Sequence, residues 1–164
     1  MKGFGASNRT TKNSIEKKFK TSQKDKLISN AFALHSKGKI KEASEIYNFL
    51  IKNKINDPRV FNNLGSIYSQ KNQLEKAILL FEESIKKFPH SLEAYPNLAN
   101  VLIFKGRSDI AKKILNKAIE LNPNYLKPYS NLASIFVRES NLEKAEFFLR
   151  KSLDIDPKDI NTLV

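Results

Sequence analysis

The chain has 164 residues, of which 40% are hydrophobic, so it is long enough to bury a core of its own. It contains no cysteine, which excludes disulfide bonds, thiolate nucleophiles and metal sites built on cysteine. No run of about 18 apolar residues occurs, and the basic N-terminus is not followed by an apolar stretch. We therefore expect no membrane-spanning helix and no secretory signal, and a cytoplasmic location is the default expectation.

The first 23 residues are polar, basic and without periodicity. Residues 1–26 hold eight Lys or Arg and two acidic residues, so they carry +6, half of the net charge of +12. Such a segment buries too little apolar surface to offset the cost of ordering it, so we expect residues 1–23 to form a disordered basic leader. Its only aromatic residues, Phe4 and Phe19, make no stacking platform for nucleic acid. We expect a solubilising leader rather than contact with nucleic acid or an anionic membrane.

From residue 24 onward the sequence repeats with a period of 34 residues. Alanine keeps this interval at Ala43, Ala77, Ala111 and Ala145, and proline keeps it at Pro89, Pro123 and Pro157. Within a unit, apolar residues recur at i, i+3 and i+7, which is one face of an α-helix. The pattern predicts a pair of helices in each unit. First helices are expected near 25–37, 58–71, 92–105 and 126–139, and second helices near 40–54, 74–88, 108–121 and 142–155.

Local signals add detail to these helical pairs. Small residues such as Gly65 and Ala77 are expected where the two helices of a unit approach closely. One turn column holds Gly38, Asn72, Gly106 and Ser140. Asn72 with Glu75, and Ser140 with Glu143, match the capping-box pattern that opens a helix. Pro96 lies about one turn into its helix, where its missing N–H predicts a distorted or 3₁₀ first turn around residues 92–96.

These columns resemble the tetratricopeptide repeat (TPR) pattern over residues 24–159, and they are closest to bacterial TPR arrays that carry an asparagine ladder. The resemblance implies an all-α fold: a right-handed α-solenoid of four helical hairpins, residues 24–57, 58–91, 92–125 and 126–159, behind the disordered basic leader. The tryptophan column of the family holds Leu27, Phe61, Tyr95 and Tyr129 here. Residues 160–164 begin a further, truncated helix, so we expect either a piece of a longer protein or a covered C-terminal face.

In TPR proteins the first helices line a concave groove, and the resemblance implies that this chain has one too. Asparagine recurs once per unit on these helices, at Asn63, Asn97 and Asn131. An amide offers both a donor and an acceptor to a peptide backbone, and asparagine costs a helix about 0.5 kcal/mol relative to alanine. Either these amides bind a peptide ligand, or solvent and neighbouring helices satisfy them. The other residues implied to line the groove are Arg59, Asn62, Ser66, Asn100, Lys127, Ser130 and Arg138.

The sequence therefore favours a scaffold that binds a protein or peptide in its groove. We expect no catalytic residue, no metal site and no cofactor, because no phosphate-binding loop, nucleophile triad or metal-ligand cluster occurs. The carboxylate clamp of chaperone-binding TPR proteins is incomplete, since Ile28 and Phe32 stand where its first pair belongs. Two alternatives remain. In one, the array is the accessory N-terminal region of a larger bacterial enzyme, of glycosyltransferase, sulfotransferase or dioxygenase type. In the other, it is a scaffold that self-assembles through its C-terminal face.

Overall fold

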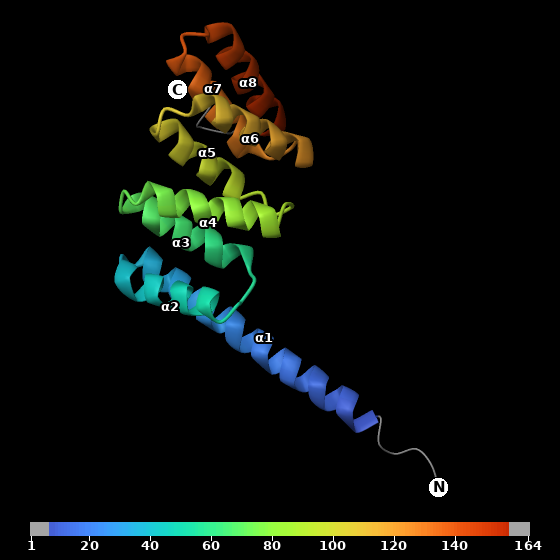
Figure 1. Ribbon diagram of the computed structural model, residues 1–164. Helices are drawn as coiled ribbons and strands as arrows, with labels where there is room; N and C mark the ends of the chain where they lie inside the picture. Colours follow the sequence, from blue (N-terminus) through green and yellow to red (C-terminus); the bar gives the residue numbers. More distant parts are fainter. Residues whose placement is uncertain (1–6, 158–164) are drawn as a thin grey trace. The chain divides into compact units, whose positions relative to one another are not determined.

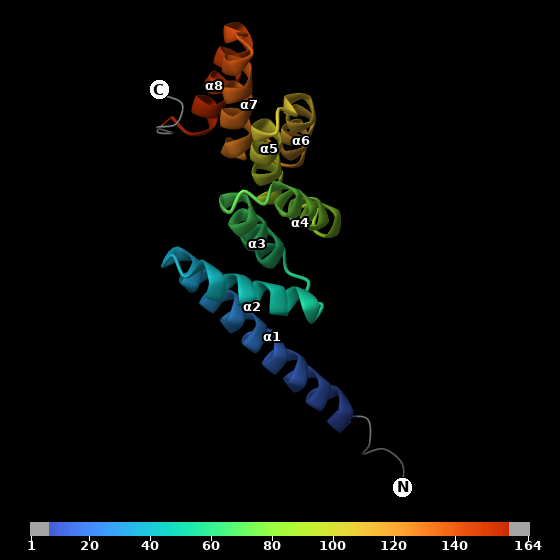
Figure 2. The same cartoon turned by 60° about the vertical axis from the view of Figure 1, so that its left-hand side comes forward.

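A computed structural model describes residues 7–157 of the chain, with side chains from residue 22 on. Over residues 7–157 the chain forms eight α-helices and no strand (Figures 1 and 2). The helices are α1 (Ser7–Ser36), α2 (Ile40–Lys52), α3 (Pro58–Gln70), α4 (Leu74–Lys87), α5 (Ala94–Phe104), α6 (Ser108–Leu121), α7 (Leu126–Arg138) and α8 (Leu142–Ile155). Within that range, none of them combines the length and the apolar character needed to cross a membrane.

The helices predicted from the 34-residue period are confirmed, and their ends agree with the observed ends to within about two residues. The start of α1 is the exception. It begins at Ser7 and so extends into the segment 1–23 expected as the leader, because neither glycine nor proline interrupts residues 7–36. Residues 1–6, and the helix start expected at 160–164, lie outside the described range.

The chain divides into two compact units, Met1–Val60 and Phe61–Val164, and α3 crosses the boundary between them. In the first unit, α1 packs against α2. The fully buried apolar side chains of this hairpin are Ile28, Ala31, Ala43, Tyr47 and Leu50. Because Ala43 belongs to the repeated alanine column, the first hairpin is built on the same close helix contact as the later ones.

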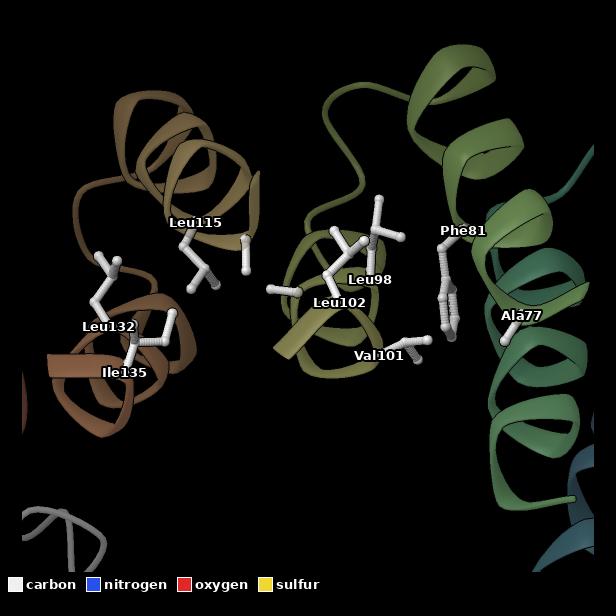
Figure 3. Packing of buried hydrophobic residues seen from close by; sticks show 10 residues of the cluster. Ala77, Phe81, Leu98, Val101, Leu102, Leu115, Leu132 and Ile135 are labelled. Atoms are coloured by element: carbon white, nitrogen blue, oxygen red, sulfur yellow. The ribbon is translucent and has the colours of Figure 1, made fainter. Parts of the chain in front are cut away.

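In the second unit one apolar core runs from α4 through α5 and α6 to α7 (Figure 3). Phe81 of α4 faces Leu98 of α5, and Leu115 of α6 faces Leu132 of α7. The close approach of α3 and α4 explains the glycine at position 65, since a Cβ atom there would lie only 2.6 Å from Cε1 of Phe81. The small-residue columns therefore set the distance between paired helices, as predicted.

The turn column ends the first helix of each pair rather than opening the second. Its four members, Gly38, Asn72, Gly106 and Ser140, all have a positive φ between 57° and 76°. Behind Asn72, the N–H of Gln73 donates to the carbonyl of Tyr68 at 2.8 Å, which is the hydrogen bond of a left-handed C-terminal cap. The predicted capping boxes at Asn72 and Ser140 are therefore wrong. At α8 the cap is Asn141, whose Oδ1 accepts from the N–H of Lys144 at 3.1 Å.

The irregular turn predicted ahead of Pro96 is confirmed. Helix α5 begins at Ala94, and at its start the N–H of Tyr95 donates to the carbonyl of Leu92, three residues back, at 3.2 Å. Pro96 is thus the third residue of its helix. A first-turn N–H has no acceptor within the helix, so the proline removes no helical hydrogen bond.

Candidate functional site

Two adjoining pockets lie along α5 in the second unit. The smaller, of about 200 Å³, is lined by Ser66, Ser69, Gln70, Phe81, Asn97 and Asn100. The larger, of about 510 Å³, is lined by Pro96, Asn97, Asn100, Leu126, Lys127, Ser130 and Asn131. The two pockets share Asn97 and Asn100, so together they form one surface, which we call the α5 groove. Six of the ten residues predicted for the binding site line it.

Helical periodicity explains why these polar side chains meet. Asn97 and Asn100 are three residues apart on α5, and on α7 Lys127 precedes Ser130 by three residues and Asn131 by four. Residues three or four apart project from one face of a helix. Because α5 also contacts α7 directly, the repeat brings the two polar faces together.

The amides of the α5 groove include one bonded pair and one amide that is open to a ligand. Nδ2 of Asn131 donates to Oδ1 of Asn100 at 2.9 Å, so this amide bonds to a neighbouring helix as well as facing the groove. Half-buried Asn97 has no hydrogen-bond partner among the described residues. The groove thus presents the amide donor and acceptor of Asn97. It also presents Nδ2 of Asn100 and Oδ1 of Asn131, which their mutual hydrogen bond does not use.

Lys127 is the one charged side chain among the residues lining the α5 groove. It is exposed, and it forms no ion pair with a carboxylate in the described part of the chain. No acidic side chain lines either pocket. The groove is therefore largely neutral, with a single positive charge at the α7 side.

Comparison with known families identifies the repeat. Two models, each described as tetratricopeptide repeat, match residues 68–134 and 126–159. Together they cover more than half of the chain. The chain belongs to the tetratricopeptide repeat family. No curated protein sequence matches it.

Solved TPR structures share the fold. The protein YrrB, described as a TPR protein with an unusual peptide-binding site, has a TM-score of 0.70 and 21% identity, with 81% of this chain and 69% of that one covered. MamA from Desulfovibrio magneticus RS-1 has a TM-score of 0.69 and 22% identity over 84% of this chain and 78% of its own. The first TPR of Spaghetti, bound to an HSP90 peptide, has a TM-score of 0.60 and 21% identity, covering 65% and 84%. The described part of the chain is accordingly an all-α TPR solenoid.

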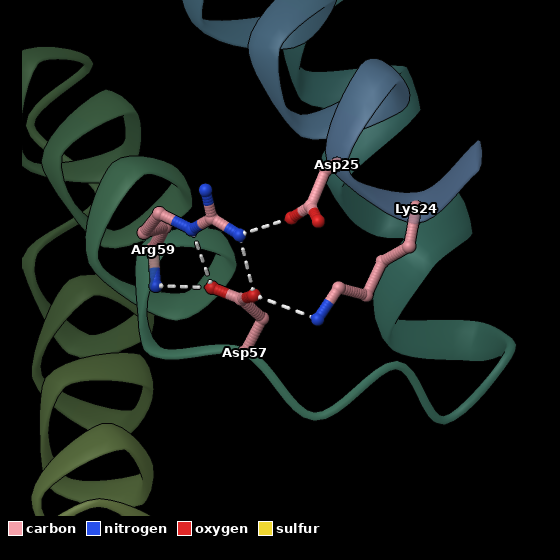
Figure 4. Close-up of polar contacts among 4 residues, drawn as sticks. All are labelled: Lys24, Asp25, Asp57 and Arg59. Carbon is pink, nitrogen blue, oxygen red and sulfur yellow. Dashed lines mark hydrogen bonds and ion pairs between the residues drawn. The ribbon is translucent and has the colours of Figure 1, made fainter. Parts of the chain in front are cut away.

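Arg59, one of the predicted groove residues of this TPR array, takes part in an ion cluster of the first unit (Figure 4). Its Nη2 donates to Asp25 at 2.6 Å and to Asp57 at 2.8 Å, and Lys24 lies 3.1 Å from the same Asp57 carboxylate. Hydrogen bonds to Asp57 and then Asp25 raise the pKa of Arg59. Burial raises the pKa of Asp57, but hydrogen bonds from Arg59 and Lys24 outweigh it and hold that pKa below its ordinary value.

The remaining predicted residues lie outside the two pockets. Asn63 is half-buried, and Arg138 is exposed at the last residue of α7. Asn62 is only 7% exposed, and its buried Oδ1 has no hydrogen-bond partner. Of the predicted ladder, Asn97 and Asn131 are therefore the members that line the α5 groove. Sequence reasoning missed Ser69 and Gln70, although they follow Ser66 at helical spacing on the same face of α3.

Proposed function

We propose that this TPR array binds a segment of another protein, held in extended form along the α5 groove. One observation carries the proposal: Asn97 and the bonded pair Asn100 and Asn131 line a single groove with hydroxyl side chains and no carboxylate. This arrangement is suited to neutral hydrogen-bonding groups rather than to a cation or a metal ion.

An extended peptide matches what the groove offers. Its N–H and C=O groups alternate along the chain, and each must find a partner when the segment is desolvated. Asparagine is the side chain that serves both kinds of group at once. Peptide binding by YrrB and by the Spaghetti TPR, as their descriptions state, supports a peptide as the ligand class here.

The lone Lys127 limits the role of ligand charge. A clamp for a C-terminal carboxylate requires several basic side chains, and this groove presents one. We therefore assign the main contacts to the ligand's backbone, with Lys127 favouring ligands that are neutral or mildly acidic nearby.

Peptide-array screening of the purified chain, followed by titration of the strongest peptide, tests the proposal. The double variant Asn97→Ala with Asn131→Ala should bind that peptide about tenfold or more weakly, because unpaired peptide groups in a desolvated groove are costly. Its melting temperature should stay close to that of the wild type, since the gain in helix propensity from two alanines offsets the loss of the exposed Asn131–Asn100 hydrogen bond. The control is Asn116→Ala, the same change at an exposed position of α6. Equal affinities for the wild type and the double variant would overturn the proposal.

A further inference from the structure

The first hairpin contains a pocket of its own between α1 and α2, with a volume of about 420 Å³. Leu27, Leu34 and Ile46 supply its apolar walls, and Glu42 and Glu45 of α2 supply its charged side. The residue of this hairpin in the asparagine column, Ser29, does not line it. The pocket is therefore a separate surface from the face that forms the α5 groove in the later repeats.

The pocket exists because the first hairpin lacks rings that another hairpin has. The positions equivalent to Leu27, Leu34 and Ile46 in the α7–α8 hairpin are Tyr129, Phe136 and Phe148. There, the ring of Phe148 stacks on Phe136 with centroids 5.6 Å apart and meets Tyr129 at 6.5 Å. Leucine and isoleucine are smaller than these rings, so the space that the rings fill in the α7–α8 hairpin stays open in the first one.

One position beside the pocket carries the opposite charge to its equivalents in the α3–α4 and α7–α8 hairpins. Lys144 lies 5.4 Å from the ring centre of Phe136, and Lys76 lies 5.3 Å from that of Tyr68. In both cases the chain supplies an ammonium group over its own ring. The first hairpin has Glu42 in the column of Lys76 and Lys144.

The second carboxylate of the pocket, Glu45, is also peculiar to the first hairpin. The later repeats place no acidic residue in its column, which holds Leu79, Lys113 and Phe147. Glu45 is exposed and forms no ion pair with a residue in the described part of the chain. Glu42 pairs with the exposed Lys39, at 3.4 Å.

We propose that the α1–α2 pocket binds a partner protein through an aromatic side chain that neighbours a lysine or arginine. The ring would occupy the space that Phe136 and Phe148 fill in the α7–α8 hairpin, and the cation would pair with Glu45. Phe49, which is 55% exposed beside the pocket, offers an edge or face for contact with the incoming ring. One ligand can supply both components, because the apolar space and Glu45 belong to the same pocket.

The test is a titration of the isotope-labelled full chain, followed by NMR, with the peptide Gly-Ser-Lys-Phe-Lys-Ser-Gly. Saturable shift changes are expected in residues 27–49. Peptides with alanine for the phenylalanine, or glutamate for both lysines, should bind about tenfold or more weakly. The variant Glu45→Lys should weaken binding to a similar degree, whereas the control Glu82→Lys, an equal charge change at an exposed position of α4, should not.

A filled-pocket variant completes the test. Leu34→Phe with Ile46→Phe restores the ring pair of the α7–α8 hairpin, so it should abolish the shift changes while the helical signal is kept. If that variant does not fold, the Glu45→Lys comparison decides alone. The proposal fails if wild type shows no saturable change, if the folded filled variant binds equally well, or if the changes map to the α5 groove. A further outcome is that the peptide-free wild type self-associates while the filled variant does not. That result would show that the pocket binds a second copy of the chain, and it would overturn the assignment to a separate partner.

Discussion

Asp57 is a residue whose replacement should destabilise the first unit. Its side chain is 7% exposed, and it accepts hydrogen bonds from the N–H, Nε and Nη2 of Arg59 and lies 3.1 Å from Lys24. It precedes Pro58, the first residue of α3, so it is also the N-cap of that helix. One carboxylate thus caps α3 and pairs with Lys24 of α1.

Two substitutions separate these roles. Asp57→Asn keeps a good N-cap but removes the charge. Hydrogen bonds to charged groups contribute about 1.5–3 kcal/mol each when buried, but Arg59 is half exposed, so solvent screening reduces the expected loss to about 1–2 kcal/mol. Asp57→Ala also removes the cap, worth about 1 kcal/mol, so we expect a total loss of about 2–3 kcal/mol.

Urea unfolding followed by circular dichroism measures both losses. The control is Asp109→Asn, whose ion pair with Lys112 at 2.9 Å is exposed and should contribute little to stability. Since the pKa of Asp57 is lowered in the folded chain, its contribution is full above the unfolded value of about 3.9 and is lost as the pH falls through the folded pKa. The difference between wild type and Asp57→Asn should therefore be constant from pH 7 to 5 and shrink below about pH 4. A difference that grows on acidification, or equal losses for the Asp57→Asn and Asp109→Asn variants, would refute this account.

Three further changes probe the second unit by the same urea assay. Gly65→Ala places a methyl group 2.6 Å from Cε1 of the buried Phe81 ring. The cost of overpacking, about 1–3 kcal/mol, should exceed the gain in helix propensity of about 1 kcal/mol. A variant more stable than the wild type would show that the Phe81 ring can move aside. Ala111→Leu, at a fully buried position, should cost about 1–3 kcal/mol, and the exposed control Ile110→Leu should be close to neutral. Tyr129→Phe removes the hydroxyl that donates to the Pro123 carbonyl at 2.8 Å, and about 1 kcal/mol should be lost.

The helices of this TPR array could be predicted because several independent columns carry the same information. Ala77 and Ala111 are both fully buried where two helices meet, and Phe81 and Leu115 follow each of them one turn later. A period in small and large apolar residues reports packing directly, since only the buried face is constrained in both size and polarity. The turn column was less certain, because asparagine and serine suit both a helix N-cap and a left-handed C-terminal residue.

The candidate site was predictable only in part. The period showed that Asn97 and Asn131 occupy equivalent positions, and both line the α5 groove. It could not show that Arg59 would be held by Asp25 and Asp57, because such an ion cluster depends on side-chain contacts between α1 and the start of α3. Nor could it show that Asn62 would be buried, since a helical position does not by itself fix the neighbours that cover it.

The α1–α2 pocket that we propose as a binding site is formed by departures from the repeat, whereas the α5 groove is lined by a column that recurs. Every hairpin needs its small alanine and its apolar helix faces to form at all, so these columns say little about partners. Leu27, Leu34 and Ile46 fulfil that packing requirement while leaving a space, and Glu42 and Glu45 then place charge beside it. Leaving an apolar space open to solvent costs stability, roughly 25 cal/mol for each Å² of apolar surface that stays exposed. A hairpin that tolerates this cost, and adds carboxylates found in no other unit at those positions, has the features of a surface completed by a ligand.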